Sequence, residues 1–403
     1  MSVLNILEEK LAETKKQGRF REFLNLERGV QDKPWATSHG HHGERRLNVW
    51  CSNDYLAMSH HPKVLLATTE AVNRVGLGTC GARSISGTSV YHSELETLLA
   101  SAYGKESALL FTTGFGANDA TLSTLCDAIP DLIVFSDELN HASMIYGIRY
   151  SKAEKKIFRH NDVAHLAELL QAADPARPKL IAFESLYSMD GDFAPLAQIV
   201  ALAEQYQALT YLDEIHSASV YGERGLGYAE QLGLLDKITI IQGGFGKSYG
   251  AAGGYIAAPR SVVEAVRSWA PAFVFSTSSP APVVAAALAS FKYNLEHDTQ
   301  RKHLLAIVDH LKTGLRAAGI PLVSADSHIL PLRVGDPHRN KHISKVLLDE
   351  HDIYVQPVNA PTVPAGSERL RVTPTSAHSH ADVETFLAAL GRVWAANDLR
   401  RAG

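Results

Sequence analysis

The sequence of 403 residues contains only three cysteines, and it has no long apolar run and no block of like charge. Cys51, Cys80 and Cys126 match no metal-binding or disulfide spacing, so we expect small buried side chains in a reducing compartment. No stretch is long and apolar enough to span a bilayer, and the first residues lack a basic segment followed by an apolar core. These features predict a cytoplasmic protein.

Charge is nearly balanced along the chain. Lysine and arginine number 39 and aspartate and glutamate 43, which gives a net charge of −4 and indicates neither nucleic acid nor a membrane surface as a partner. Among the 19 histidines, His39, His41 and His42 lie close together. Their polar run offers no carboxylate at matching spacing, so no metal site is predicted. The composition is that of an ordinary soluble enzyme.

The order of apolar and polar segments predicts an α/β protein of two domains. Residues 3–27 have leucine and phenylalanine at helical spacing and predict an amphipathic helix, and residues 30–46 form a polar link. Helical segments then alternate with short apolar runs, which predict strands at 108–112, 132–136, 180–184, 209–213, 238–242 and 254–257. Such alternation predicts a mostly parallel sheet with helices on both faces and ligands at the C-terminal strand ends.

The last third of the chain predicts a smaller α+β domain. A helical stretch at 280–317 precedes strands near 322–324, 329–334, 354–356 and 370–373, and a helix at 381–396 follows. We therefore expect an N-terminal helix and link at 1–45, a large domain at 46–290 and a small C-terminal domain at 291–403.

Two short motifs after predicted strands suggest a cofactor held on a lysine. Lys247 lies between Gly246 and Ser248, just past an apolar run, where a desolvated amine can act as a nucleophile. Asp213 ends another apolar run 34 positions upstream (247 − 213) and could hold the protonated ring nitrogen of pyridoxal 5′-phosphate (PLP). Taken alone, Lys247 could be a solvated loop lysine and Asp213 with Glu214 a strand-ending turn. Their combination favours a PLP site.

A phosphate cradle is predicted where a strand runs through glycines into a helix at 117–126. The cradle would comprise Thr113, Gly114, Phe115 and Asn118. Free amide groups at such a helix start favour binding of a dianion such as phosphate. The same residues are also typical of an ordinary turn followed by a helix cap.

Three more polar side chains follow predicted strands. His141 could stack on a planar ring or cap a helix, and Ser188 could contact cofactor or substrate or lie in a plain turn. His216, three residues after Asp213, could reach the ring hydroxyl or be a structural histidine. All three lie at the expected ligand-binding ends of the strands.

Six ordered motifs resemble the α-oxoamine synthases, from Gly18 to the final helix. They are Val49-Trp50-Cys51-Ser52-Asn53-Asp54-Tyr55-Leu56, Ser86-Gly87-Thr88, Leu139-Asn140-His141-Ala142-Ser143-Met144, Ser185-Leu186-Tyr187-Ser188-Met189-Asp190-Gly191-Asp192, Phe275-Ser276-Thr277-Ser278 and Arg369-Leu370-Arg371-Val372-Thr373-Pro374. Within that family, the Trp50 motif and the runs 354–359 and 361–364 are most similar to the aminolevulinate-forming branch.

The resemblance implies a PLP-dependent transferase of fold type I, similar to aspartate aminotransferase, with a mostly parallel sheet in the large domain. It implies an obligate homodimer with active sites at the subunit interface. Lys247 would hold PLP as a Schiff base, His141 would stack on the ring, and Asp213 and His216 would bind the ring nitrogen and the ring oxygen. Ser276 and Thr277 would reach the phosphate from the other subunit.

The resemblance also assigns substrate residues. Arg371 matches the arginine for the amino-acid carboxylate, and Asn53 and Ser188 belong to the same pocket. Arg21 matches the arginine that meets the succinyl carboxylate of succinyl-CoA, and Thr362 lies in the run that resembles the aminolevulinate branch. The expected partners are thus glycine, an acyl-CoA and a second copy of the chain.

The chain departs from the family pattern at several positions. Ala82 and Ser84, next to Ile85, replace a threonine and an asparagine that help to hold succinyl-CoA. Gly244 stands where a phosphate-binding threonine is usual, and Ala360 where a bulkier aromatic is common. We expect these changes to bear on acyl specificity and on one phosphate contact.

The expected reaction is condensation of glycine with succinyl-CoA, with loss of carbon dioxide, to give 5-aminolevulinate. A sister synthase that forms 8-amino-7-oxononanoate or 2-amino-3-oxobutyrate is the nearest alternative. From other classes, a catalytically silent partner subunit is disfavoured by Lys247, and an aminotransferase-like regulator by the absence of a basic DNA-binding unit.

Overall fold

The computed structural model describes residues 2–40, 43–397 and 399, so His41 and His42 lie outside the described residues. The chain forms two compact units. We call Met1–Tyr55, Ser188–Asp192 and Lys302–Gly403 the terminal unit, and Leu56–Tyr187 with Phe193–Arg301 the central unit. The domain boundaries expected from the sequence remain a prediction, but residues 1–55 belong with the C-terminal residues here.

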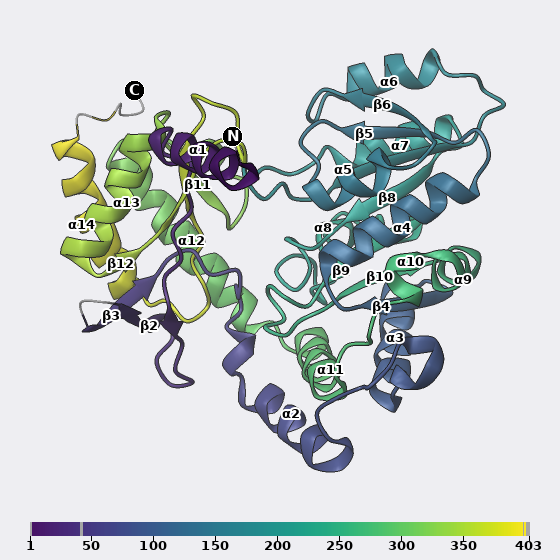
Figure 1. The fold of residues 1–403 in the computed structure, drawn as a ribbon, viewed down its shortest axis with the longest axis horizontal. Coiled ribbons are helices and arrows are strands. Elements are labelled where there is room, and N and C mark those ends of the chain that lie inside the picture. Colours follow the sequence, from purple (N-terminus) through teal and green to yellow (C-terminus); the bar gives the residue numbers. More distant parts are fainter. Residues whose placement is uncertain (1, 41–42, 398, 400–403) are drawn as a thin grey trace. The chain divides into compact units, whose positions relative to one another are not determined.

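A seven-stranded sheet forms the middle of the central unit (Figure 1). Its order is β4-β10-β9-β8-β7-β5-β6. Only β10 runs antiparallel to its neighbours, so the mostly parallel α/β sheet is confirmed. The strands are β4 (Ser107–Phe111), β5 (Ile133–Asp137), β6 (Glu154–Phe158), β7 (Lys179–Glu184), β8 (Leu209–Asp213), β9 (Ile240–Gly244) and β10 (Gly254–Ala258).

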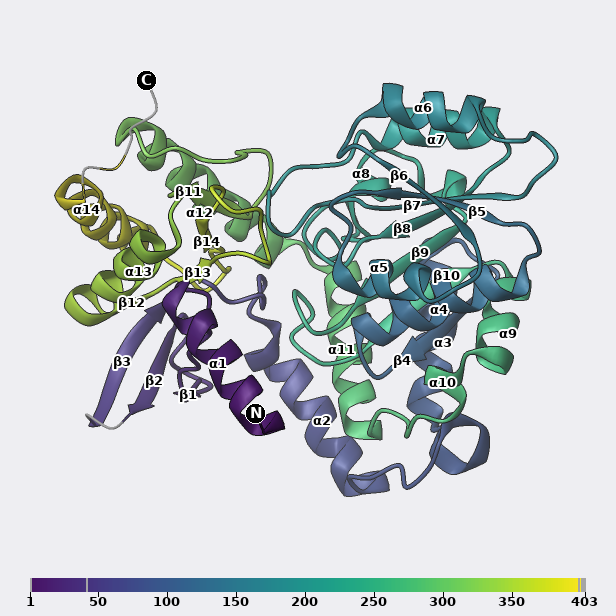
Figure 2. The same cartoon turned by 45° about the horizontal axis from the view of Figure 1, so that its top comes forward.

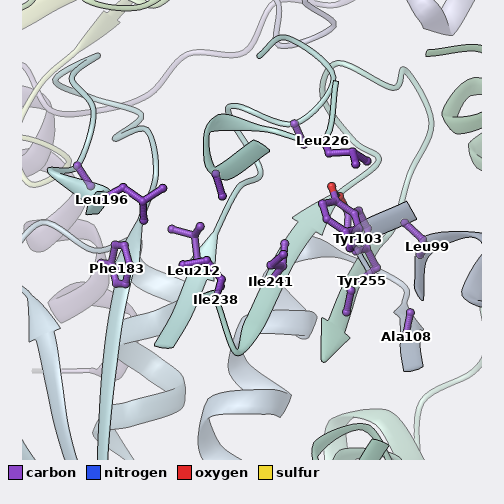
Figure 3. Close-up of a cluster of buried hydrophobic side chains, with 14 of the residues drawn as sticks. Leu99, Tyr103, Ala108, Phe183, Leu196, Leu212, Leu226, Ile238, Ile241 and Tyr255 are labelled. Carbon is purple, nitrogen blue, oxygen red and sulfur yellow. The ribbon is translucent and has the colours of Figure 1, made fainter. Parts of the chain in front are cut away.

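Helices cover both faces of this sheet, because apolar side chains point to both sides of its buried strands. One face packs against α3 (Val90–Tyr103), α6 (Val163–Gln171), α7 (Leu196–Gln205) and α11 (Ala281–Glu296). The other packs against α4 (Gly114–Ala128), α5 (Ala142–Arg149), α9 (Arg260–Trp269) and α10 (Pro271–Val274). Figure 3 shows the first core, where the hydroxyls of Tyr103 and Tyr255 lie 2.6 Å apart.

Shorter elements complete the central unit. Helix α2 (Pro62–Val75) packs against α11, and α8 (Tyr228–Gln231) follows β8. Single helical turns span Met58–His60 and Leu235–Lys237, and a π-helical turn spans Arg83–Gly87. Each buried leucine, isoleucine or phenylalanine of the two cores contributes about 1.5–3 kcal/mol, which holds the strand ends rigidly.

The terminal unit contains two smaller sheets, of order β1-β2-β3-β12 and β11-β14-β13, the first of which is partly visible in Figure 2. Its core includes Trp50, Phe386 and Trp394, all nearly inaccessible to water. The strands are β1 (Leu26–Glu27), β2 (Trp35–Gly40), β3 (Gly43–Val49), β11 (Leu330–Arg333), β12 (Ile353–Tyr354), β13 (Gln356–Val358) and β14 (Arg369–Val372). The helices are α1 (Val3–Lys16), α12 (Thr299–Ala317, which begins in the central unit), α13 (Pro337–His351) and α14 (His380–Ala396).

Several local predictions were wrong. The helix expected at 3–27 ends at Lys16, because Gly18 takes a left-handed φ of 67° and its amide, like that of Arg19, bonds back to the last turn. Most of the polar link expected at 30–46 lies instead in the β2–β3 pair, which spans Trp35–Gly40 and Gly43–Val49. The stretch at 280–317 is two helices, and residues 322–324 form only an isolated bridge from Leu322.

The cysteines differ in their surroundings. All three are free thiols; Cys126 is buried and Cys51 is half-buried, but Cys80 is exposed, so its expected burial was wrong. Cys80 lies in an irregular segment with a φ of 52°, where the chain turns at the surface. Within the described residues, no helix has the length and apolarity needed to cross a membrane.

Candidate functional site

Lys247 and His216 lie together at the C-terminal ends of two neighbouring strands, β9 and β8. The Lys247 Nζ is 2.5 Å from the His216 Nε2. His216 is buried and Lys247 half-buried. The loop that carries the lysine is fixed by the buried Phe245 and Tyr249 and by a hydrogen bond from the Gly250 amide to the Lys247 carbonyl. The structure therefore holds this amine at a defined place beside an imidazole.

Asp213, the last residue of β8, is a buried carboxylate whose hydrogen-bond donors are all neutral groups. The Ile215 amide donates to its Oδ1 and the Asn118 side chain to its Oδ2, both at 2.8 Å. Asn118 is itself oriented, since it donates to Ser143 Oγ at 3.0 Å and accepts from the Tyr211 hydroxyl at 2.8 Å. A carboxylate held in this way suits a ligand that offers a cationic N–H group.

His141 caps α5, and its imidazole is held by Ser143. Its Nδ1 accepts from the Ser143 amide at 3.2 Å and lies 2.7 Å from Ser143 Oγ. Although the residue is exposed, desolvation lowers the pKa of the imidazole; Asp213 opposes this shift and Lys247 adds to it. A neutral ring with Nδ1 as acceptor is the form that the surroundings favour.

Glu184, at the end of β7, was missed by the sequence analysis as a site residue. Its Oε1 accepts a hydrogen bond of 2.6 Å from the His141 amide. Burial, followed by the charge of Asp213, raises the pKa of Glu184 well above its usual range, and Lys247 opposes the shift. The signal that could have identified it is an acidic residue that ends an apolar strand, as Asp213 does.

The predicted phosphate cradle is the N-terminus of α4. Thr113 caps the helix, with its Oγ1 accepting from the Gly116 amide at 2.9 Å, and helix geometry leaves the first amides, from Gly114 and Phe115, without intrahelical acceptors. A Cβ at Gly114 or at Gly244 would come within 2.6 Å of Ile215 Cδ1. The space that a larger residue at position 244 would need is thus occupied by Ile215.

A second group of predicted residues lies in the terminal unit, around Arg371 on β14. Its guanidinium donates to the Ser188 carbonyl at 2.7 Å, to Asn53 Oδ1 at 3.0 Å and to the Tyr55 hydroxyl at 3.2 Å. Tyr55 was not predicted; it packs edge-on against His328. Three of the five N–H donors of the guanidinium are used, which leaves two for a carboxylate.

Arg21 and Thr362 also lie together in the terminal unit, where Arg21 donates to Thr362 Oγ1 at 2.8 Å. Both line a cavity of about 780 Å³ between the segment 18–24, α13 and the segment 354–362. The segment is tied down through its backbone, since Lys341 Nζ donates to the Phe20 carbonyl and Asn359 to the Gly18 carbonyl. Arg21 therefore projects from an anchored segment.

The remaining predicted residues form a separate group in the central unit. Ala82 and Thr277 are paired by an isolated antiparallel bridge. Ser84 and Ile85 lie exposed in the π-helical turn, with Ile85 83% exposed. Ser276 donates to the Ala272 carbonyl at 2.5 Å. The predicted acyl residue Ala82 and the predicted phosphate residue Thr277 are thus neighbours.

Comparison with known proteins decides the family. The family model described as aminotransferase class I and II matches residues 46–390. A 5-aminolevulinate synthase from Rhodobacter capsulatus is 48% identical over 96% of this chain and 95% of its own length. The one from Rhizobium meliloti is 49% identical over 96% of both chains. The chain belongs to the α-oxoamine synthase family.

A solved structure supports the fold and the cofactor of this α-oxoamine synthase. A structure described as SPT with a PLP internal aldimine is 30% identical, with a TM-score of 0.93, over 99% of this chain and all of its own. The family uses PLP, and the residues present fit that cofactor. They supply an amine at Lys247, a buried carboxylate at Asp213, an imidazole at His141 and a helix N-terminus at Thr113.

Proposed function

We propose that this α-oxoamine synthase condenses glycine with succinyl-CoA to give 5-aminolevulinate, CoA and carbon dioxide. The observation that carries the proposal is the Lys247–His216 pair beside the buried Asp213, in a chain 48–49% identical to 5-aminolevulinate synthases. In the reaction, a carbon–carbon bond forms between the glycine α-carbon and the thioester carbonyl carbon. The carbon–sulfur bond breaks to release CoA, and the glycine carboxylate leaves as carbon dioxide and is replaced by a proton.

The residues of the central unit account for the proton transfers. PLP, when bound, supplies an electron sink for the negative charge at the glycine α-carbon. Lys247 would hold the cofactor and, once displaced by glycine, remove and return the α-proton as a general base, with His216 fixing its amine. Asp213 would keep the ring nitrogen protonated, and His141 would cover the ring. The amides at the start of α4 would bind the phosphate.

Arg371 would bind the carboxylate of glycine. Its two remaining donors point from a guanidinium that Asn53, Tyr55 and the Ser188 carbonyl already orient, so little side-chain entropy is lost on binding. A planar fork of this kind matches a carboxylate in a bidentate way. Of the two roles predicted for Ser188, the substrate role fits its place beside Arg371.

Arg21 is expected to set the preference for succinyl-CoA. An acyl chain without a terminal carboxylate would leave the guanidinium with one charged hydrogen bond fewer, which costs about 1.5–3 kcal/mol, or roughly 10- to 100-fold in affinity. We therefore expect Arg21→Leu to remove the preference for succinyl-CoA over butyryl-CoA, measured as a ratio of kcat/KM. Arg19→Leu, in the same segment but bonded to the Ala360 carbonyl, is the matched control and should keep the preference.

Ala82 and Ser84 favour a broader acyl range than Arg21 alone would allow. Each lacks part of the polar surface expected there, at a cost on the order of 1 kcal/mol each, and leaves room beside the acyl chain. Longer acyl-CoAs should therefore be accepted unusually well, with succinyl-CoA still best. If the wild-type enzyme prefers acetyl-CoA or octanoyl-CoA, Arg21 does not bind the carboxylate of the acyl group. The sister-synthase assignment would then replace the assignment to 5-aminolevulinate formation.

We also propose a homodimer in which Ser276 and Thr277 serve the partner's active site. Supporting this, Phe275 beside them is 84% exposed and Ile85 83% exposed, and a subunit interface would remove such large apolar side chains from water. Mixed dimers of a Lys247→Ala chain and a Ser276→Ala, Thr277→Val chain should regain activity at the one site that has both wild-type parts. Mixed dimers as inactive as their parents would show that each chain uses its own Ser276 and Thr277.

The cytoplasmic location remains part of the proposal and rests on the cysteine pattern. Fractionation of the cells that produce the protein tests it. Recovery with the membranes or in the medium would contradict it.

A further inference from the structure

Glu184 contacts two residues of the candidate cofactor site, His141 through a side-chain hydrogen bond and Asp213 through strand pairing. It ends β7, is 2% exposed, and pairs in register with Asp213 on β8. Its Oε1 accepts from the His141 amide at 2.6 Å. Glu184 therefore lies between the residue predicted to stack on the PLP ring and the residue predicted to hold the ring nitrogen.

Several hydrogen bonds anchor the loop that presents His141, and Glu184 provides one of them. Asp137, at the end of β5, accepts from the Leu139 amide at 2.8 Å. Asn140 donates to the Ala182 carbonyl on β7, also at 2.8 Å. The backbone of His141 itself is then tied to Glu184. Because the imidazole projects from that backbone, the side chain of Glu184 helps to determine where the ring lies.

The charge on Glu184 follows from its neighbours. Burial and the nearby Asp213 and Asp137 favour the neutral acid, whereas Lys247 and the His141 amide favour the carboxylate. Two carboxylates at adjacent buried strand ends are hard to ionise together, because neither is solvated. Asp213 has two N–H donors and a predicted cationic ligand, so the proton belongs on Glu184.

We propose that Glu184 is a positioning residue of the cofactor site: as an uncharged acid it holds the His141 backbone through its Oε1 and adds no negative charge beside Asp213. The proposal rests on the proposed function only in taking PLP as the cofactor. It does not depend on which acyl-CoA reacts.

The test compares Glu184→Gln with Glu184→Ala, using the dissociation constant for PLP and the circular dichroism of bound PLP. Glutamine keeps the acceptor oxygen and has no charge, so both quantities should stay within about twofold of wild type. Alanine removes the acceptor, so PLP affinity should fall roughly two- to tenfold and the circular dichroism should weaken. Glu184→Gln matching the alanine variant would overturn the proposal, as would an alanine variant that matches wild type.

A pH profile decides the matter even if Glu184→Ala does not fold. Exchange of the glycine α-proton for deuterium needs no acyl-CoA and can be followed by NMR. If Glu184 is already neutral, the exchange profile of Glu184→Gln should overlay that of wild type from about pH 6 to 9, where ordinary carboxyls are ionised. Divergence of the two profiles would show that Glu184 works as a carboxylate. If wild type exchanges no glycine proton at all, the proposed function fails, while the PLP measurements still decide the role of Glu184.

Discussion

Lys247→Ala is expected to abolish turnover while the protein stays folded. The side chain is half-buried at the surface of a strand-end loop that Phe245 and Tyr249 anchor independently, so its removal leaves the core intact. Loss of the general base alone costs about 10²–10⁴-fold, and loss of the covalent attachment adds to this. Steady-state assays should therefore detect no product, and borohydride should no longer fix PLP to the chain.

Two matched variants separate chemistry from charge. Lys247→Arg places a cationic side chain beside His216 but offers no nucleophilic amine, so it should be as inactive as the alanine variant. Lys237→Ala removes an exposed lysine paired with Glu204 and should leave activity and PLP attachment unchanged. Borohydride fixing PLP to another lysine in an active Lys247→Ala enzyme would disprove the assignment.

Asp213→Asn should lower kcat/KM nearly as much as Lys247→Ala does, although aspartate and asparagine have the same shape. Both carboxylate oxygens of Asp213 accept N–H bonds, Oδ1 from the Ile215 amide and Oδ2 from the Asn118 side chain, whose own oxygen accepts from Tyr211. An asparagine at 213 would therefore turn its NH₂ group against one of these two donors. The change also removes the charge that would pair with the protonated ring nitrogen. Removing one partner of a buried pair costs about 3–5 kcal/mol, which is roughly 10²- to 10⁴-fold in kcat/KM.

Asp213→Glu and Asn118→Ala are the controls for this prediction. Glutamate keeps the charge but shifts it by one methylene group, so part of the activity should remain. Asn118→Ala removes one hydrogen bond to a charged group, worth about 1.5–3 kcal/mol, and should cost less than the loss of the charge. An Asp213→Asn enzyme with near wild-type kcat/KM would show that no cationic group meets this carboxylate.

The parts of the fold that could be predicted are those with an unambiguous apolar period. The run Leu209–Asp213 is almost wholly buried, so its mostly apolar and β-prone residues identify a strand and place Asp213 at its end. The edge strand β6 was missed because Glu154, Lys155 and Lys156 are polar and lie at the edge of the sheet. The apolar pattern of a strand reflects which of its residues are buried. An edge strand with one solvent-exposed face therefore has a weak apolar pattern in the sequence.

The candidate site also combines residues that a sequence pattern identifies with contacts that it does not. Lys247 and Asp213 are recognisable because glycines and apolar runs flank them, but which atoms hold them depends on residues distant in sequence. Ile215 fills the space beside Gly244, and Asn118 orients Asp213 from a different helix. Tyr55 and Glu184 contact Arg371 and His141, which are distant from them in sequence. The partners in such contacts come from tertiary packing, so a local pattern can place Glu184 at a strand end but cannot show which group it binds.

The most direct test is to give the purified, PLP-loaded enzyme glycine with a panel of acyl-CoAs and to identify each product by mass. Succinyl-CoA should give 5-aminolevulinate with the highest kcat/KM, together with one carbon dioxide and one free CoA for each molecule formed. Butyryl-CoA should follow at roughly one tenth to one hundredth of that value. A higher kcat/KM for an uncharged acyl-CoA, or no condensation with succinyl-CoA, would contradict the account.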